Sequence, residues 1–290
     1  MAPDKQGGYV VTILMSIFLG LVQGIAEFLP ISSSGHLSIL QNLLSLDYQS
    51  EQHLLFGMLL NLATLISICV VYRKELGAML SSGKDYLRDR SDGEADEPAI
   101  LKPQARTLLF ILIGTLPMFL VLIFSSSIVR LFYNTAFVGF ALLITGGLLF
   151  VSDKYITRGS KTERTIQLSD AVIVGLVQAV AALPGLSRSG TTIAVGLARG
   201  FSGSFAVRFS ILLSVPALLG ATIVLLVRVI INGADFSLLP MYLAGFIIAT
   251  VVGFFAIQIL RRIVSKGGFG KIAFYCWGLG ALAILLTLIL

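Results

Sequence analysis

The chain has 290 residues, enough for two soluble domains, but its composition excludes them. Hydrophobic residues make up 56% of the chain and charged residues only 12%, about half the charged fraction of a typical soluble domain. Because so few polar residues cannot cover a water-soluble globule, we expect an all-α integral membrane protein, whose apolar stretches are long enough to cross the bilayer as helices.

Six stretches without Asp, Glu, Lys or Arg are long enough to span the roughly 30 Å hydrocarbon core of a bilayer. In chain order they are residues 54–72, 107–129, 135–152, 209–227, 236–260 and 272–290. Two further apolar regions, 6–46 and 171–198, are interrupted by Pro and Gly at 28–35 and 184–190. Since these residues break helices, each region predicts a hairpin of two short helices.

The two interrupted regions resemble each other at an offset of 155 residues. The matching positions are Gly20, Leu21, Val22, Gln23, Ser32, Ser34 and Gly35 in the first region and Gly175, Leu176, Val177, Gln178, Ser187, Ser189 and Gly190 in the second. Three long apolar segments follow each region. This order predicts a duplication within one membrane domain, residues 1–290. The first repeat is 9–155, with its hairpin at 9–46, and the second is 168–290, with its hairpin at 169–200.

The distribution of positive charge predicts the orientation. If each hairpin is re-entrant and leaves the bilayer on the side it entered, each half crosses three times and the second half is inverted. Fifteen of the 21 Lys and Arg residues then lie on one side, in the loops 73–106, 153–168 and 261–271, and three lie on the other. The positive-inside rule makes the first side cytoplasmic.

An alternative topology agrees less well with the positive-inside rule. If both hairpins were full spans, the chain would cross eight times, and the basic loop 261–271 would lie outside. The net charge of +6 comes from basic residues that lie between the apolar segments and act as topology signals, so we expect no nucleic-acid partner.

Loop 73–106 mixes acidic and basic residues, and we interpret it as a solvated linker that takes no part in the chemistry.

The first hairpin carries a carboxylate in an apolar setting. Gln23 and Glu27 are four residues apart and share a helix face. At bilayer depth a carboxylate costs several kcal/mol unless it has a partner or water. We interpret Glu27 as functional, the alternative being a glutamate near the interface that stabilises the hairpin.

Three serines and a histidine follow the proline of the first hairpin. Ser32, Ser33 and Ser34 precede a glycine, a pattern typical of a helix N-terminus that attracts phosphate. Simple capping is the alternative. His36 lies within reach of the same loop, where it would act as a general acid, base or nucleophile, or else be structural.

The second hairpin supplies a cation. Arg188 is the only charged residue of region 171–198, and it is flanked by Ser187, Ser189 and Thr192. A buried arginine needs a carboxylate or a phosphate, and its planar fork fits phosphate oxygens. The alternative is a structural ion pair with Glu27.

Together these groups suit phosphoryl-group hydrolysis of an amphiphilic substrate that arrives from the bilayer. In this hypothesis glutamate positions a divalent metal or moves a proton. A transporter or flippase for a lipid phosphate or anion is the competing hypothesis, because inverted broken helices are typical of transporters. Asn61, Gln178 and Ser214 would then line the path, although helix packing is the favoured interpretation of each. A transporter needs no nucleophile and base, and a structural subunit leaves both buried charges unexplained, so an enzyme is favoured.

The two motifs resemble the signature motifs of the undecaprenyl-diphosphatase family, the bacitracin-resistance type. They are Gln23-x-x-x-Glu27-Phe28-Leu29-Pro30 with the Ser-Ser-Ser-Gly-His run, and Pro184-Gly185-Leu186-Ser187-Arg188-Ser189-Gly190-Thr191-Thr192. The resemblance implies hydrolysis of undecaprenyl diphosphate to undecaprenyl phosphate and phosphate, which recycles the lipid carrier of peptidoglycan and other cell-wall polymers and gives bacitracin resistance. It also implies a bacterial plasma-membrane protein, a site facing the periplasmic or outer side, and Mg²⁺ or Ca²⁺.

Residue roles carry over from that resemblance by position. The catalytic residues would be Glu27, Ser33, His36 and Arg188. The substrate-binding residues would be Gln23, Ser32, Ser34, Ser187, Ser189 and Thr192. Glu27 and Gln23 would hold the metal, although many family members have glutamate in place of Gln23. Either Ser33 or His36 would be the nucleophile. Glycine-rich segments at 139–147 and 278–280 permit close helix packing within one chain or in a homodimer.

Overall fold

The computed structural model describes residues 12–43, 51–91, 102–156, 158–232 and 236–289. These residues form helices and no strand, apart from an isolated bridge between Lys161 and Phe201. The elements are α1 (Ile13–Ala26), α2 (Ser33–Leu43), α3 (Glu51–Val71), α4 (Arg73–Ser91), α5 (Pro103–Thr115), α6 (Met118–Ile123), α7 (Ser125–Phe132), α8 (Thr135–Ser152), η1 (Asp153–Tyr155), α9 (Leu168–Val180), α10 (Arg188–Ala198), α11 (Gly203–Asn232), η2 (Phe236–Leu238), α12 (Leu239–Lys266) and α13 (Phe269–Ile289).

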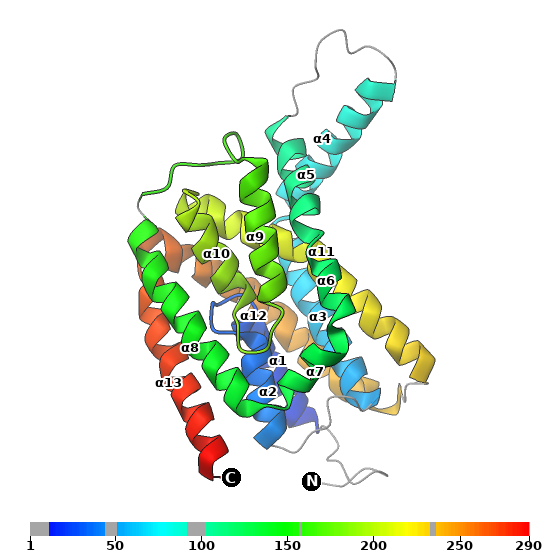
Figure 1. The fold of residues 1–290 in the computed structure, drawn as a ribbon. Coiled ribbons are helices and arrows are strands. Elements are labelled where there is room, and N and C mark those ends of the chain that lie inside the picture. The colour runs from blue at the N-terminus through cyan, green and yellow to red at the C-terminus, as the bar shows by residue number, and fades with distance from the viewer. Residues whose placement is uncertain (1–11, 44–50, 92–101, 157, 233–235, 290) are drawn as a thin grey trace.

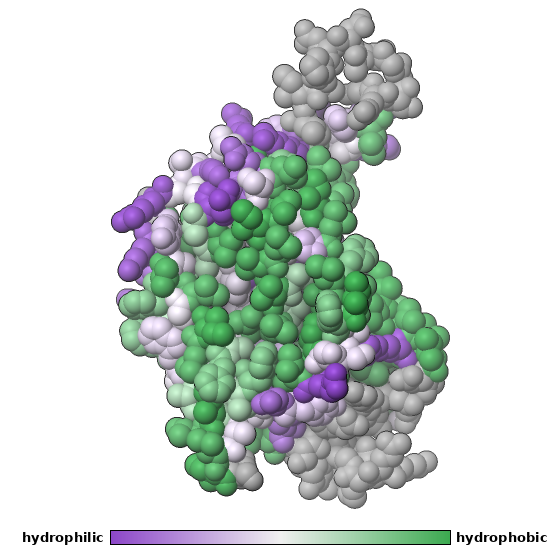
Figure 2. All heavy atoms as spheres, in the orientation of Figure 1, coloured by the Kyte–Doolittle hydropathy of each residue, from purple (hydrophilic) through white to green (hydrophobic). Residues whose placement is uncertain are grey.

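Six helical stretches of the described chain are long and apolar enough to cross a membrane, which confirms the predicted all-α membrane fold. They are Leu54–Val71, Pro103–Ile123, Thr135–Tyr155, Gly203–Ile231, Phe236–Lys266 and Phe269–Ile289. Figure 2 shows hydrophobic side chains over the middle of the molecule, with hydrophilic side chains gathered toward its two ends. The chain is therefore a multi-pass membrane protein.

Two sequence expectations need correction. The stretch 107–129 is not one continuous helix: α5 ends at Thr115, and α6 and α7 follow as short helices. Pro117 lies at the first break. Proline interrupts a helix because it has no N–H for the backbone hydrogen bond and its ring crowds the preceding turn.

The expected linker 73–106 begins with a helix, because α4 covers residues 73–91. Its apolar Met79 is buried, whereas Leu80 and Leu87 are exposed. α4 packs beside α5 and projects from the body at its upper end (Figure 1). Residues 92–101 of the expected linker lie outside the described residues.

The helices pack as matching pairs from the two halves of the chain. The spans α8 and α13 occupy equivalent places in the two halves and pack against each other, as do α3 and α11. The first helix of each hairpin packs against a span of the other half: α1 lies against α12, and α9 lies against α5. Glycine makes the last two contacts close. A Cβ atom at Gly20 would collide with the carbonyl oxygen of Gly245, and one at Gly175 with that of Gly114. Gly20 and Gly175 are 155 residues apart, so both predicted repeats use the same close contact.

The two predicted hairpins are present as α1–α2 and α9–α10. The helices within each hairpin pack together. In Figure 1 the α9–α10 hairpin descends from the upper end of the molecule, and the loop that joins its helices lies at mid-height, next to α1. This arrangement brings the end of α1 to the start of α10.

Candidate active site

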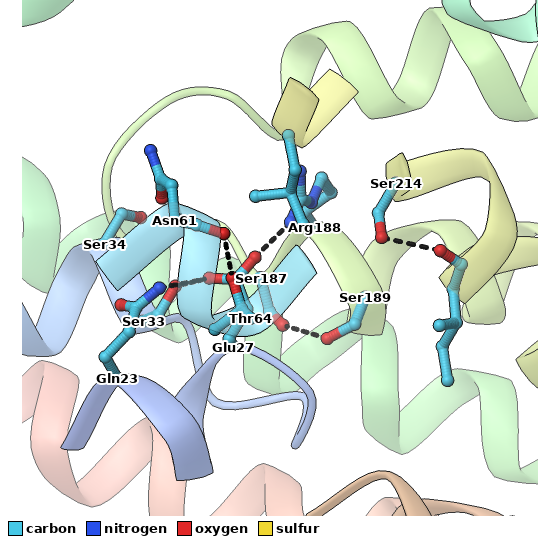
Figure 3. A network of polar contacts seen from close by, with 12 residues as sticks. Gln23, Glu27, Ser33, Ser34, Asn61, Thr64, Ser187, Arg188, Ser189 and Ser214 are labelled. Atoms are coloured by element: carbon cyan, nitrogen blue, oxygen red, sulfur yellow. Dashed lines mark hydrogen bonds and ion pairs between the residues drawn. The ribbon is translucent and has the colours of Figure 1, made fainter. Parts of the chain in front are cut away.

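Glu27 lies at the C-terminal end of α1, where three side chains contact its carboxylate (Figure 3). Its Oε1 atom forms an ion pair with Nη2 of Arg188, the first residue of α10. Its Oε2 atom accepts hydrogen bonds from Ser33 Oγ at 2.6 Å and Gln23 Nε2 at 3.1 Å. The Glu27 and Arg188 side chains are 9% and 21% exposed. The site therefore joins the two hairpins through a largely buried charge pair.

The loop before α2 is held in an unusual conformation by Ser32. Its φ of 68° lies in the left-handed region, which a residue other than glycine seldom adopts. Its hydroxyl accepts from the Gly35 N–H at 3.1 Å and donates to the Leu186 carbonyl of the second hairpin at 3.3 Å. Ser34 Oγ lies 3.2 Å away. These bonds stabilise the turn that brings Ser33 to Glu27.

The loop before α10 is anchored to α8. Ser187 caps α10, because its Oγ accepts from the Gly190 N–H at 3.1 Å. Its own N–H donates to Thr145 Oγ1 at 3.1 Å, and Thr145 in turn donates to the Gly185 carbonyl at 3.0 Å. Gly185 has a φ of +93° and packs against the α8 backbone at Val138, so a side chain there would be strained and crowded. These contacts position Arg188.

A cavity of about 390 Å³ opens at this charge pair. Its polar lining consists of Gln23, Glu27, Ser32, Ser33, Ser34, Gln41, Asn61, Gln178, Ser187 and Arg188. Apolar side chains from α3, α6 and α11 form other walls, among them Leu54, Leu60, Met118, Leu218 and Leu225. One chamber therefore offers a polar pocket and an apolar surface, as an amphiphilic ligand requires.

His36 does not line this cavity. Its Nδ1 atom lies 2.8 Å from the Ser32 carbonyl and must donate, because a carbonyl oxygen only accepts. Its Nε2 atom lies 2.6 Å from the hydroxyl of Tyr275 on α13, and the two rings stack with an interplanar angle of 5°. Both ring nitrogens are thus engaged away from Glu27, in contrast to the expected cluster.

Three other expected residues also do not line the cavity. Thr192 is buried, and its hydroxyl contacts Ser210 and the Arg188 carbonyl. Ser189 Oγ lies 3.4 Å from Ser187 Oγ but is not part of the cavity lining. Ser214, expected on a transport path, bonds to the Ile211 carbonyl of its own helix.

Sequence reasoning missed three contributors. Thr145 and Tyr275 lie inside predicted spans, where a hydroxyl is the only signal. Gln41 follows the Ser-Gly-His run by five residues, is 8% exposed and lines the cavity. Each could have been noted as a polar residue in an apolar segment, but only spatial proximity assigns it to the site.

The donor set limits how a divalent cation would bind. Among the described residues no group of three or more His, Cys, Asp or Glu side chains is placed to hold a metal ion. The cavity offers one carboxylate, Glu27, together with neutral oxygens of amides and hydroxyls. This set fits Mg²⁺ or Ca²⁺ that is held largely by substrate phosphates, since such ions often take only one or two protein carboxylates.

Known proteins resemble this chain over nearly its whole length. The sequence model of the family described as "Bacitracin resistance protein BacA" matches residues 16–282. The undecaprenyl-diphosphatase of Alkaliphilus metalliredigens is 37% identical over 281 residues, which cover 96% of this chain and all of that protein. The undecaprenyl-diphosphatases of Methanosphaera stadtmanae and Methanobrevibacter smithii are 35% and 36% identical, over 96% and 94% of this chain and 99% and 97% of their own lengths.

Proposed function

Since the chain belongs to the bacitracin resistance protein BacA family, we propose that it hydrolyses undecaprenyl diphosphate to undecaprenyl phosphate and inorganic phosphate. The observation that carries this proposal is the contact of Ser33 Oγ with Glu27, beside Arg188, at the polar end of a cavity with apolar walls. Its relatives bear the name of this activity. The reaction would recycle the lipid carrier of cell-wall polymers and so give bacitracin resistance.

Ser33 is the proposed nucleophile. Its hydroxyl donates to Glu27 Oε2 at 2.6 Å, so the carboxylate can take the proton as Oγ attacks the terminal phosphorus. The Oγ–P bond forms, the bond to the bridging oxygen breaks, and undecaprenyl phosphate leaves. Water then attacks the phosphorus of the phosphoserine: its oxygen bonds to phosphorus, its protons leave with inorganic phosphate, the Oγ–P bond breaks, and Glu27 returns its proton to Oγ.

Arg188 is proposed to stabilise the transferred phosphoryl group. A guanidinium has five N–H donors, and its contact with Glu27 leaves others for phosphate oxygens. Ser34 and Ser187 line the same cavity and would donate to further oxygens, whereas Ser32, expected to bind substrate, lines the cavity but donates its hydroxyl to the Leu186 carbonyl. Ser189 and Thr192 would support α10 instead of binding substrate.

His36 is proposed as a positioning residue. Its Nδ1–H donates to the carbonyl of Ser32, the residue in left-handed conformation. That bond stabilises the turn before Ser33 and leaves proton transfer to Glu27.

We propose that Glu27 and the Oε1 atom of Gln23 contact a divalent cation, Mg²⁺ or Ca²⁺. Gln23 Nε2 donates to Glu27, which leaves its carbonyl oxygen for a hard cation. A bound cation would supply positive charge against the phosphate oxygens.

The hairpins are proposed to be re-entrant, in inverted repeats 9–155 and 168–290 of a plasma-membrane protein whose site opens to the outer side. α1 and α9 have 14 and 13 residues, or about 20 Å, which is too short to span the bilayer. Contacts among the three basic loops support a common cytoplasmic side. Arg106 of loop 73–106 bonds to the carbonyls of Arg164 and Ile166 in loop 153–168. Arg261, at the start of loop 261–271, lies over the ring of Tyr72, which directly precedes loop 73–106.

A homodimer is the proposed assembly. Gly278 on α13 is exposed and has open space at its Cβ position, which permits close approach of a second copy.

Phosphate release from a C55 prenyl diphosphate in detergent tests the activity, with Mg²⁺, Ca²⁺ or chelator. We expect cation-dependent release by the natural protein and almost none by Glu27→Ala or Ser33→Ala. Ser127→Ala, at an exposed serine on α7, is the matched control and should be active. No release by folded protein under any condition would refute the proposal, and lipid flipping in liposomes would then test the transport alternative.

A further inference from the structure

Gln178 is a buried amide on α9 that the proposed mechanism leaves unused. Its side chain is fully buried, at 0% exposure, and it lines the cavity that holds Glu27 and Arg188. Neither Nε2 nor Oε1 has a hydrogen-bond partner among the residues that the structure describes. The observation holds whichever way the amide is turned, because both ends are without a partner.

Such an amide is unusual. Buried side-chain polar atoms are nearly always paired, since an unpaired one loses its hydration without compensation. Gln41 lines the same cavity, and its Oε1 atom likewise has no partner within the described part of the chain. Water can satisfy both amides in the free protein. The cavity wall therefore has amide atoms that can form hydrogen bonds with a ligand, because they form none with the described residues.

The duplication explains why Gln178 is unpaired. It corresponds to Gln23 at the 155-residue offset, and Gln23 donates to Glu27. The counterpart of Glu27 is Ala182, which also lines the cavity. The second hairpin thus has the amide but no carboxylate to receive its hydrogen bond.

The same offset pairs Ser33 with Arg188. The first hairpin therefore brings a carboxylate and a hydroxyl to the cavity, whereas the second brings a guanidinium and a free amide. The second group suits an anion, because both side chains donate hydrogen bonds and one is positively charged.

We propose that Gln178 contacts the substrate by donating an amide hydrogen bond to a phosphate oxygen of the diphosphate, alongside Arg188. This assignment rests on the proposed function and adds a phosphate ligand from α9. Gln178→Leu removes both hydrogen-bonding groups at nearly the same size. We expect kcat/KM for C55 prenyl diphosphate to fall about 10- to 100-fold, the effect of losing a hydrogen bond to a charged group.

The melting temperature of the full-length protein in detergent separates this role from a structural one. In Gln178→Leu it should be unchanged or higher, because the amide has no hydrogen bond to lose with any described residue. Gln178→Glu should lose more activity than Gln178→Leu, since a carboxylate there repels phosphate. Gln258→Leu is the matched control on α12, outside the cavity lining, and should retain full activity.

A non-hydrolysable probe separates failure of this inference from failure of the proposed function. Methylenediphosphonate should raise the melting temperature of the natural protein and protect Gln178→Leu much less. If the natural protein binds the probe in this way but releases no phosphate, the diphosphatase assignment fails and the role of Gln178 stands.

Three results would overturn the inference. One is a folded Gln178→Leu variant with kcat/KM within twofold of the natural protein. Another is a lower melting temperature with unchanged protection by methylenediphosphonate. The third is failure of both Gln178→Leu and Gln178→Met to fold, which would show that the fold itself needs the amide.

Discussion

At the scale of single residues, the buried pair of Glu27 and Arg188 dominates the chemistry. Each charge stabilises the other where water is scarce, and Ser33 and Gln23 add hydrogen bonds to the same carboxylate. The pair is therefore both a structural tie between the hairpins and the polar centre of the cavity.

Removing one partner should destabilise the protein more than removing both. Arg188→Ala leaves the Glu27 carboxylate buried without its cation, at a cost of up to about 3–5 kcal/mol. The double variant Glu27→Ala/Arg188→Ala should regain part of that stability and stay inactive. Denaturation midpoints in detergent measure this coupling in the natural protein, Glu27→Ala, Arg188→Ala and the double variant. If the stability losses of the two single variants add up to that of the double variant, the pair contributes no coupling energy.

The geometry of Arg188 is also testable. Arg188→Lys should lose most activity, because a point charge cannot contact Glu27 and phosphate oxygens with a planar fork. Phosphate release at saturating substrate measures the loss. Near-normal turnover by the lysine variant would contradict the proposed fork.

Variants of His36 distinguish the two candidate nucleophiles, Ser33 and His36, between which the sequence did not decide. His36→Phe should lower activity about 10- to 100-fold by removing the donor to the Ser32 carbonyl. His36→Asn should recover much of it, because an asparagine amide can donate from nearly the position of Nδ1. Steady-state phosphate release compares the two. If His36 were the nucleophile, the asparagine variant would be as inactive as the phenylalanine variant.

At the scale of helices, close glycine contacts position the two hairpins. Gly20 of α1 lies against Gly245 of α12, and Gly175 of α9 lies against Gly114 of α5. α1 carries Glu27 at its end and α9 leads into the loop before Arg188, so these contacts set the distance across the cavity.

Adding one methyl group at these glycines should impair stability and activity together. Gly20→Ala or Gly175→Ala forces two helix backbones apart, at about 1–3 kcal/mol. Gly147→Ala on α8 is the control, because no atom apart from the neighbouring backbone of its own helix lies within 4 Å of its Cβ position and alanine favours helix. Thermal denaturation and phosphate release measure both effects. Wild-type behaviour of Gly20→Ala would show that the helices tolerate separation.

At the scale of the whole molecule, the arrangement in the membrane decides which side supplies substrate. The basic loops gather at one end through contacts such as Arg106 with the Arg164 carbonyl. The other end carries Arg130 on α7, with few basic residues around it in sequence. This asymmetry favours the proposed orientation, with the upper end of Figure 1 on the cytoplasmic side.

Cysteine labelling of intact cells should show this orientation. Cys69 is exposed and Cys276 is buried, so Cys69→Ser provides the background. A membrane-impermeant maleimide should label Arg130→Cys from outside but leave Ser265→Cys unlabelled until the membrane is permeabilised. The reverse pattern would invert the proposed topology.

Much of this protein followed from residue order alone. Composition excluded a soluble fold, runs without charge located the six spans, and the Pro and Gly interruptions located the two pairs of short helices. Glu27 and Arg188 stood out because an isolated charge in an apolar segment requires a partner. These inferences depend on transfer free energies and helix geometry, which act locally along the chain.

Other features required contacts between distant segments. The sequence placed His36 with Glu27 because they are neighbours in the chain, but the ring turns to Tyr275, 239 residues away. The bond from Ser32 to the Leu186 carbonyl and the bond from Ser187 to Thr145 likewise join segments that lie far apart in the chain. Side-chain direction at a loop is set by packing against other helices, and its free energy comes from contacts that the local sequence does not contain.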